Sequence, residues 1–382
     1  MFLTNQDIRD LIAFRRDLHR HPEVSGDEAQ TAARVIGALG DGPDQIIAQL
    51  GGHGVAAVFN GAAAGPTLLI RAELDALPIV ETNKFAHASA TTGVAHLCGH
   101  DGHSTILTAL ARGLARQRPA RGRVILMFQP AEETGAGARA VLADPAFAPL
   151  RPDMAISLHN MPRMPLGHVA LQAGPFACAS RGMKITLTGA PTHAAQPEFG
   201  RSPMQALARL MPALAALAPA GAPLGDGFRL VTITHANMGA PAYGIAPGMA
   251  EVRATLRTLR DTDMADLVAQ AQQLAEEIAR DAALSLDIAY EDVFAATDNA
   301  PQATALLDRA VATCGLSRHD RALLIRASED FGEFGALCPA AMLLLGAGAD
   351  APQLHNEDYD FPDDLIAIGA QIFMTAVRAY LG

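Results

Sequence analysis

The stretch RVILMFQPAEE (residues 123–133) decides the fold, because a short apolar run in it is cut off abruptly by polar and acidic residues. Such a run is typical of a strand that is covered on both faces of a sheet. Four further runs end in the same way, at residues 55–59, 67–75, 154–160 and 341–348. Helical stretches separate several of these runs. The alternation predicts an α/β domain with a mixed, largely parallel sheet and helices on both faces.

A different pattern occupies residues 178–290. It predicts strand, helix, strand, strand, helix and strand, with the helices at 202–218 and 262–281. This β-α-β-β-α-β order is the split pattern of a ferredoxin-like α+β domain. We therefore expect a catalytic domain built from residues 1–177 and 291–382, with the smaller domain inserted into it.

Composition narrows the class of protein and its compartment. The chain has 382 residues and a net charge of −11, so a nucleic-acid or anionic-membrane surface is not expected. No apolar run reaches the ~18 residues of a membrane span, and the first residues lack the apolar block of a signal peptide. The four scattered cysteines indicate reduced thiols and a cytoplasmic protein rather than a disulfide framework.

Two helices are expected before the first strand. Thr4 and Asp7 resemble a capping box that opens the first helix. Ser25 and Glu28 resemble a capping box that opens the second, which is expected to end near Gly40.

Side chains that bind metals follow several of the strands. Glu132 and Glu133 end the stretch quoted above, His159 ends a second run, and His355 follows a third. Ligands of open α/β sheets bind outside the carboxyl ends of the strands, so these side chains are expected to meet there.

The stretch VAHLCGHDGH (residues 94–103) adds a thiol and one further candidate imidazole, that of His100. Cys98 and His100 are two residues apart, so in an extended segment their side chains share one face. The expected donors are Cys98, His100, Glu133, His159 and His355. Five donors are one too many for a closed tetrahedral zinc site, and they suit two metals that share a bridging ligand.

Glu132 is the remaining acid. Neighbouring side chains diverge in an extended segment, so Glu133 can hold metal while Glu132 faces the metal-bound water as a general base. Each signal alone has an ordinary alternative. A lone histidine after a strand is more often a hydrogen-bonded structural residue, and paired glutamates usually open a solvated helix. Their coincidence at several strand ends favours the metal site.

The same residues carry a resemblance to a known family. Its motifs here are FRRDLHRHPEVSGDE, RAELDALPI, HLCGHDGH, FQPAEETGAGA, GAPTHAAQP, ATLRT, SEDFGEF and LHNEDYDF, in the family's order from residue 14 to residue 361. With them the chain resembles the amidohydrolase branch of the dinuclear metallopeptidases that contains hippurate hydrolase, indoleacetyl-amino-acid hydrolases and bacterial aminoacylases. The resemblance implies the same five metal ligands and Glu132 as the base.

Further roles are implied by the resemblance and not by local pattern. The inserted domain is expected to dimerise and to act as a lid, with His193 reaching the partner subunit's active site to polarise the scissile carbonyl. Arg257 corresponds to the residue that holds the substrate's free carboxylate. Asp75 corresponds to an aspartate near the metals that orients their ligands, and Asp101 and His103 are expected to give similar support. From pattern alone, His193 is a loop histidine and Arg257 an exposed strand arginine.

The chain departs from the family at two places. The family usually has DMDALP, whereas Glu73 and Leu74 precede the aspartate here, which places a longer acid near the site. The family commonly has Asn-Val-Ile-Pro where this chain has YGIAP (residues 243–247). Gly244 therefore supplies no side-chain donor to the substrate. Either Tyr243 compensates, or the substrate lacks the usual group.

The expected activity is hydrolysis of the amide bond of N-acyl amino acids or related small amides by a metal-bridging water. The enzyme is expected to be a homodimer with two divalent ions per subunit. Thiolate and imidazole favour Zn²⁺, whereas carboxylates also tolerate Mn²⁺, which family members often use. Two alternatives stay open: a hydrolase of a non-standard amide without the usual carboxylate, and an inactive relative that binds acylated amino acids.

Overall fold

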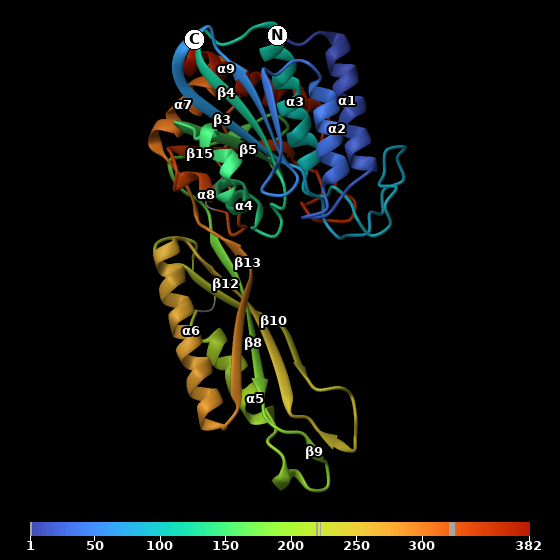
Figure 1. The fold of residues 1–382 in the computed structure, drawn as a ribbon, viewed down its shortest axis with the longest axis vertical. Coiled ribbons are helices and arrows are strands. Elements are labelled where there is room, and N and C mark those ends of the chain that lie inside the picture. The colour runs from blue at the N-terminus through green and yellow to red at the C-terminus, as the bar shows by residue number, and fades with distance from the viewer. Residues whose placement is uncertain (1, 219–220, 222, 321–324) are drawn as a thin grey trace. The chain divides into compact units, whose positions relative to one another are not determined.

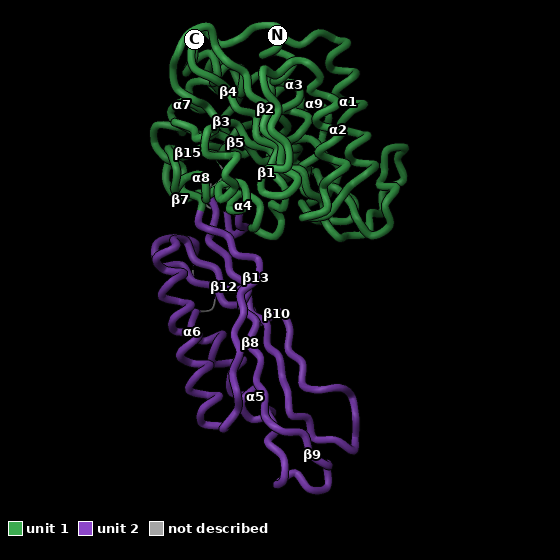
Figure 2. The backbone as a smooth tube through the Cα atoms, in the orientation of Figure 1, with its two compact units in different colours: residues 1–176, 297–323, 330–382 green, residues 177–296, 324–329 purple. Residues whose placement is uncertain are grey.

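The protein forms two compact units (Figure 2). The structure is a computed structural model that describes residues 2–218, 221, 223–320 and 325–382. Unit 1 comprises Met1–Phe176, Thr297–Leu323 and Asp330–Gly382, and unit 2 comprises Ala177–Ala296 and Leu324–Glu329.

The centre of unit 1 is a seven-stranded sheet with the order β1-β2-β4-β3-β5-β15-β6 (Figure 1). The four central strands β4, β3, β5 and β15 run parallel, and the edge strands join them antiparallel. The strands span Gln45–Leu50 (β1), Gly54–Asn60 (β2), Ala63–Glu73 (β3), Arg121–Gln129 (β4), Met154–Pro162 (β5), Val169–Ala170 (β6) and Ala340–Gly348 (β15). The expectation of a mixed, largely parallel sheet is confirmed.

Helices cover both faces of this sheet. Successive residues of a strand point to opposite faces, and Ile70 of β3 packs in a core cluster with residues of α3 and α9. Its neighbour Arg71 instead faces the ring of Phe331, which precedes α8. The helices of unit 1 are Asn5–Arg20 (α1), Ala29–Leu39 (α2), His100–Arg116 (α3), Gly137–Ala143 (α4), Pro145–Leu150 (3₁₀, η1), Pro301–Thr313 (α7), Gly332–Gly335 (α8) and Asp364–Leu381 (α9).

Helix α9 is long and apolar enough to cross a membrane by length and composition. In the structure it lies in the core of unit 1, where Leu365, Ile372 and Phe373 are fully buried. Its apolar character is therefore accounted for by packing against α3 and α7.

Unit 2 is a ferredoxin-like domain, as the sequence predicts. A four-stranded antiparallel sheet has the order β10-β12-β8-β13. Apolar residues of α5 and α6 share a core with alternate residues of β8. The elements are Ala179–Thr188 (β8), Met204–Ala215 (α5), Arg229–Met238 (β10), Met249–Thr258 (β12), Asp261–Asp281 (α6) and Ser285–Phe294 (β13). Short elements complete the fold: Gly174–Ala177 (β7) pairs with Thr297–Asn299 (β14), Thr192–His193 (β9) pairs with Ile245–Ala246 (β11), and Pro197–Phe199 (η2) follows β9.

The bounds of unit 2 differ from the expected inserted segment. The unit runs from residue 177 to residue 296 and also includes residues 324–329, which the sequence analysis assigned to the catalytic domain. This later segment belongs to unit 2 because Ile325 forms a bridge with Ala177 and the carbonyl of Ala327 accepts from the N–H of Cys178. Such long-range pairing leaves no signal in local sequence.

Only one of the two expected capping boxes is present. Thr4 and Asp7 exchange both hydrogen bonds at the start of α1, as predicted. The second box is absent from the start of α2. Ser25 instead donates a hydrogen bond of 2.7 Å to Asp75, and Glu28 accepts from the N–H of Ala131 at 2.8 Å. Both side chains therefore support the site described below rather than a helix end.

Candidate metal centre

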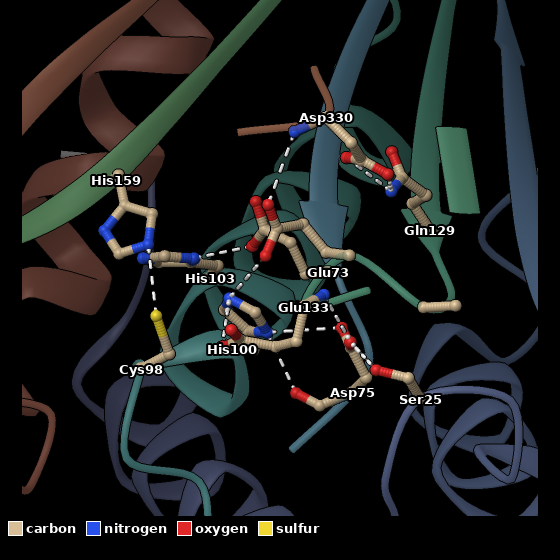
Figure 3. Close-up of polar contacts among 12 residues, drawn as sticks. Ser25, Glu73, Asp75, Cys98, His100, His103, Gln129, Glu133, His159 and Asp330 are labelled. Atoms are coloured by element: carbon tan, nitrogen blue, oxygen red, sulfur yellow. Dashed lines mark hydrogen bonds and ion pairs between the residues drawn. The ribbon is translucent and has the colours of Figure 1, made fainter. Parts of the chain in front are cut away.

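The predicted metal-binding side chains of unit 1 converge at the carboxyl end of its parallel strands. His159 belongs to β5, Glu132 and Glu133 lie in the turn after β4, His355 follows β15, and Cys98 precedes α3. Carboxyl ends of parallel strands lie at the same edge of a sheet, which is why segments so distant in sequence meet. Figure 3 shows Cys98, Glu133 and His159 pointing into one region.

The segment around Cys98 and His100 is not extended, contrary to our expectation. Gly99 has φ +95°, and His100 is already the first residue of α3. A Cβ atom at residue 99 would lie 2.3 Å from Oδ1 of Asn160. Glycine is therefore required both by the left-handed backbone and by the close approach of β5. The sharp turn, rather than strand alternation, places the thiol and the imidazole on the same side.

Two of the imidazoles have a tautomer that is fixed by the backbone. Nδ1 of His100 lies 2.9 Å from the carbonyl oxygen of Asp75, and Nδ1 of His159 lies 2.8 Å from the carbonyl oxygen of Asn160. A carbonyl oxygen can only accept, so each Nδ1 donates its hydrogen. In the neutral form of each ring, Nε2 then carries the lone pair, as in histidines that bind metals.

The Nε2 atoms face the other candidate ligands. Nε2 of His159 lies 3.4 Å from Sγ of Cys98. Nε2 of His100 lies 3.9 Å from a carboxylate oxygen of both Glu132 and Glu133. Among the described residues, this buried His100 nitrogen has no hydrogen-bond partner. A buried imidazole nitrogen that faces two carboxylates fits a bound cation, because the cation can take the place of the ring's proton.

Glu132 and Glu133 do not diverge along an extended segment, as we had expected. They lie in a turn in which Ala131 has φ +50°, and the N–H of Glu133 donates to Asp75 at 2.9 Å. The turn brings both carboxylates to the same imidazole nitrogen. The two side chains therefore do not point in opposite directions. Glu133 as a metal ligand and Glu132 as a base must be distinguished by the groups around each carboxylate.

The donor atoms form overlapping groups of three. Within each group, one ligand atom from each residue lies within 4.8 Å of the other two. Three of these groups contain the predicted ligands: Cys98, His100 and His159; Cys98, Glu133 and His355; and His100, Glu132 and Glu133. Because Cys98, His100 and Glu133 each occur twice, the groups join into one cluster larger than a single three-residue site.

The charges of the cluster favour a cation. Burial alone would lower the pKa of His100, but its hydrogen bond with Asp75 and the charge of Glu73 raise it to about 10. Burial lowers the pKa of His159 to about 3, so this imidazole is neutral. Burial and the charge of Glu133 hold the pKa of Cys98 well above its usual value. The surrounding carboxylates therefore stabilise positive charge, and the thiol needs a cation to ionise.

Asp75 lies beside the cluster and contacts two of its members, His100 and Glu133. The carboxylate is buried and accepts hydrogen bonds from the hydroxyl of Ser25 and the N–H of Glu133. One of its oxygens is 3.3 Å from Nδ1 of His100. These contacts suit the orienting role that the resemblance implies for Asp75.

Two predicted substrate-binding positions lie together with His193 in unit 2. His193 pairs with Ile245 in the two-stranded β9–β11 sheet, and the N–H of Ala194 donates to the carbonyl of Gly244. The side chain of Tyr243 is fully exposed. His193 is exposed as well, and its Nδ1 lies 3.1 Å from the N–H of Ala195.

Arg257 lies in the four-stranded sheet of unit 2, at the end of β8 opposite to the end that leads to His193. It pairs with Ser180 at the start of β8, whereas His193 follows the end of that strand. Ten strand residues span roughly 30 Å, so the two side chains of one chain do not meet. Arg257 is half-buried and donates to Ser328, and no ion pair with a described residue neutralises it.

Three residues near the cluster were not expected to support it: Asp330 and Gln129, which are fully buried, and Ser25, which is half-buried. The motif SEDFGEF contains Asp330, whose N–H donates to Glu132 at 3.4 Å. Ser25 was interpreted as a helix cap, and Gln129 as the end of a strand. The only signal for Asp330 and Gln129 was their place in the motifs quoted above.

Proteins of related sequence support this description. A hippurate hydrolase from Campylobacter jejuni is 29% identical over 96% of this chain and 95% of its own length. An N-acetyl-L-cysteine deacetylase from Bacillus subtilis is 34% identical over 69% of this chain and 62% of its own length.

A solved structure of a dinuclear metal-binding peptidase of the M20 family from Bacillus subtilis superposes with a TM-score of 0.82 and 25% identity. The superposition covers 99% of each chain. The sequence model that describes peptidase family M20/M25/M40 matches residues 69–379, which include the candidate centre and the ferredoxin-like unit. The chain therefore belongs to peptidase family M20/M25/M40.

Proposed function

We propose that this protein is a metal-dependent amidohydrolase that cleaves the amide bond of N-acyl amino acids or related small amides. Membership of a peptidase family makes amide hydrolysis the reaction class. The observation that carries the proposal is the cluster at the strand ends of unit 1, where a thiol, imidazoles and carboxylates lie within 4.8 Å of one another in overlapping groups.

Two divalent cations fit the donor set. Cys98, His100, Glu133, His159 and His355 would hold them, as Zn²⁺ or Mn²⁺. Bound there, the cations would lower the pKa of a water molecule towards ~7 and polarise the substrate carbonyl. The dinuclear peptidase from Bacillus subtilis supports two ions rather than one. The free cysteines support a cytoplasmic location.

Glu132 is the residue that moves the proton. It is buried beside the cluster and would accept the proton of the attacking water. It would then return that proton to the leaving nitrogen, so that the amine departs neutral. Asp75 would hold the ring of His100 and the Glu133 turn while this happens.

Metal binding can be tested without a substrate. Metal-free protein should bind two equivalents of Zn²⁺ or Mn²⁺, and its unfolding temperature should rise with the metal concentration. Cys98→Ala should weaken this binding by at least the ~10–100-fold that is common for lost support of a metal site. The matched control is Cys314→Ala, which removes a half-buried thiol elsewhere in unit 1. Unchanged affinity in the Cys98 variant would exclude this donor set.

We also infer that the active enzyme is a homodimer. His193 is exposed on unit 2 and lies roughly 30 Å from Arg257 of its own chain. If both contact one substrate, they must come from different subunits. Arg257 would anchor the substrate's carboxylate, and His193 of the second subunit would donate to the carbonyl oxygen.

Gly244 offers a direct test of the substrate's carboxylate side. Nothing lies within 4 Å of a Cβ atom at this residue, and its φ is not in the left-handed region. Gly244→Asn should therefore leave the unfolding temperature unchanged. It should raise kcat/KM for carboxylate-bearing N-acyl amino acids by ~10-fold, the value of one added hydrogen bond to a charged group. A lower kcat/KM would show that the pocket requires the open space instead.

A further inference from the structure

A buried network of charged side chains lies directly behind the proposed centre in unit 1. Arg71 lies in β3 and is almost completely buried. Its guanidinium donates to Gln129 through Nε at 2.9 Å, to Asp330 through Nη2 at 2.6 Å, and to Glu73 through Nη1. All three acceptors are fully buried. One guanidinium therefore joins two acidic side chains that belong to different segments.

The first branch of the network runs from Asp330 to the proposed base. The carboxylate of Asp330 accepts from Arg71, from Nε2 of Gln129 and from the N–H of Ala138, with the last two at 2.8 Å. These contacts fix a residue that lies in a turn before α8. Its own N–H then donates to Oε1 of Glu132. The network thus reaches the proposed base through one hydrogen bond of 3.4 Å. Figure 3 shows the contact between Gln129 and Asp330.

The second branch runs from Glu73 to a proposed metal ligand. Oε2 of Glu73 accepts from Nδ1 of His103 at 2.6 Å, and Nε2 of His103 accepts from the N–H of Asn160 at 3.1 Å. Because a backbone N–H can only donate, His103 must carry its hydrogen on Nδ1. The carbonyl of the same Asn160 orients the ring of His159. Figure 3 shows Glu73, His103 and His159 in this order.

The end of β5 is paired with β15 but not with β3. Pairing between β3 and β5 stops at Arg71 and Ser157, before His159 is reached. The backbone of Asn160 on that side therefore bonds to an imidazole instead of a neighbouring strand. His103 is consequently not available as a ligand, because both of its nitrogens are used.

We propose that Arg71 is a positioning residue that holds the base Glu132 through Asp330 and the metal ligand His159 through Glu73 and His103. This inference rests on the proposed function for the roles of Glu132 and His159. It assigns separate consequences to the two branches: the Asp330 branch acts on turnover, and the Glu73 branch acts on metal affinity.

The Asp330 branch is tested with Asp330→Asn, which removes the ion pair with Arg71 and keeps the size of the side chain. kcat at saturating metal should fall by ~10–100-fold, because a small displacement of a catalytic group has an effect of this size. KM and metal affinity should stay within about twofold of wild type. Circular dichroism and an assay temperature below the unfolding transition ensure that only folded protein is compared.

The Glu73 branch is tested with His103→Phe, which keeps a ring beside Phe361 and removes both hydrogen bonds. Affinity for one of the two metal equivalents should fall by ~10–100-fold in a chelator competition titration. kcat at saturating metal should return to near the wild-type value. The control Asp7→Asn breaks a buried ion pair of α1 far along the chain and should lower only the unfolding temperature.

Arg71→Met should produce both effects in one protein, and adding Asp330→Asn to it should reduce kcat no further. The proposal is overturned if Asp330→Asn and His103→Phe lower only the unfolding temperature, as Asp7→Asn does. It is also overturned if both variants lose turnover and metal affinity together. Wild-type protein that binds two metals but hydrolyses no amide would count against the proposed function alone, since the affinity titration of His103→Phe would still decide the second branch.

Discussion

Glu132→Gln is expected to lower kcat for amide hydrolysis by ~10²–10⁴-fold, the usual contribution of a positioned general base. Glutamine keeps the shape of the side chain and can still accept the hydrogen bond from the N–H of Asp330. It cannot take up a proton at neutral pH. The measurement is steady-state release of the amine by enzyme loaded with Mn²⁺ or Zn²⁺, with metal content determined on the same sample.

The matched control for this substitution is Glu333→Gln. Glu333 is a glutamate of the same unit that pairs with Arg139 at the surface, so its neutralisation should leave kcat unchanged. A Glu132→Gln enzyme with two metals bound and more than a tenth of the wild-type kcat would require another base. A variant that has lost its metals would instead place Glu132 among the ligands.

His193→Ala is expected to lower kcat by ~10²–10³-fold, the typical effect of removing one donor to the oxyanion. Metal content and the unfolding temperature should stay at wild-type values, because the His193 side chain is exposed and its hydrogen bond with the N–H of Ala195 lies within its own loop. Gln196→Ala is the control for disturbance of the loop, since that side chain is also exposed.

A mixing experiment tests whether His193 acts on the partner subunit. Homodimers of Glu132→Gln and of His193→Ala should both be nearly inactive. A heterodimer would contain one site with an intact Glu132 and an intact His193. Random exchange of subunits should therefore restore roughly a quarter of the wild-type activity. No recovery after exchange has been verified would contradict the trans-acting role.

The fold could be predicted from sequence because its signals are local. The run from Val124 to Phe128 is short and apolar, as in a strand buried on both faces, and the acids behind it mark the strand's end. The order of strands and helices in residues 178–290 was sufficient to predict the ferredoxin-like fold of unit 2. The return of residues 324–329 to that unit depends on pairing with residue 177, which has no local signature.

The candidate site could be predicted in composition but not in geometry. Spacing alone suggested that Cys98 and His100 share a strand face. In the structure the chain turns at Gly99, and α3 begins at His100. Residue 99 must be glycine because β5 passes too close for a Cβ atom. Ser25 stands where a helix cap is expected from the sequence, but its hydroxyl donates a hydrogen bond to Asp75, 50 residues away. Side chains at a functional site satisfy distant partners, and these override local preference.

Arg71 illustrates the same limit for the residues that position the site. In the sequence it is one arginine in an apolar run, and of its two acidic partners only Glu73 lies near it. In the structure it pairs with Asp330, 259 residues later, and with Glu73. Because burying an unpaired guanidinium is costly, such a residue predicts acidic partners but not which ones.

The most direct measurement is amine release from a panel of N-acyl amino acids and simple aryl amides by the metal-loaded protein, by metal-free protein and by Glu132→Gln. The account predicts activity on carboxylate-bearing N-acyl amino acids that needs added Mn²⁺ or Zn²⁺ and disappears in the variant. Activity that is independent of metal, or equal in Glu132→Gln, would contradict it.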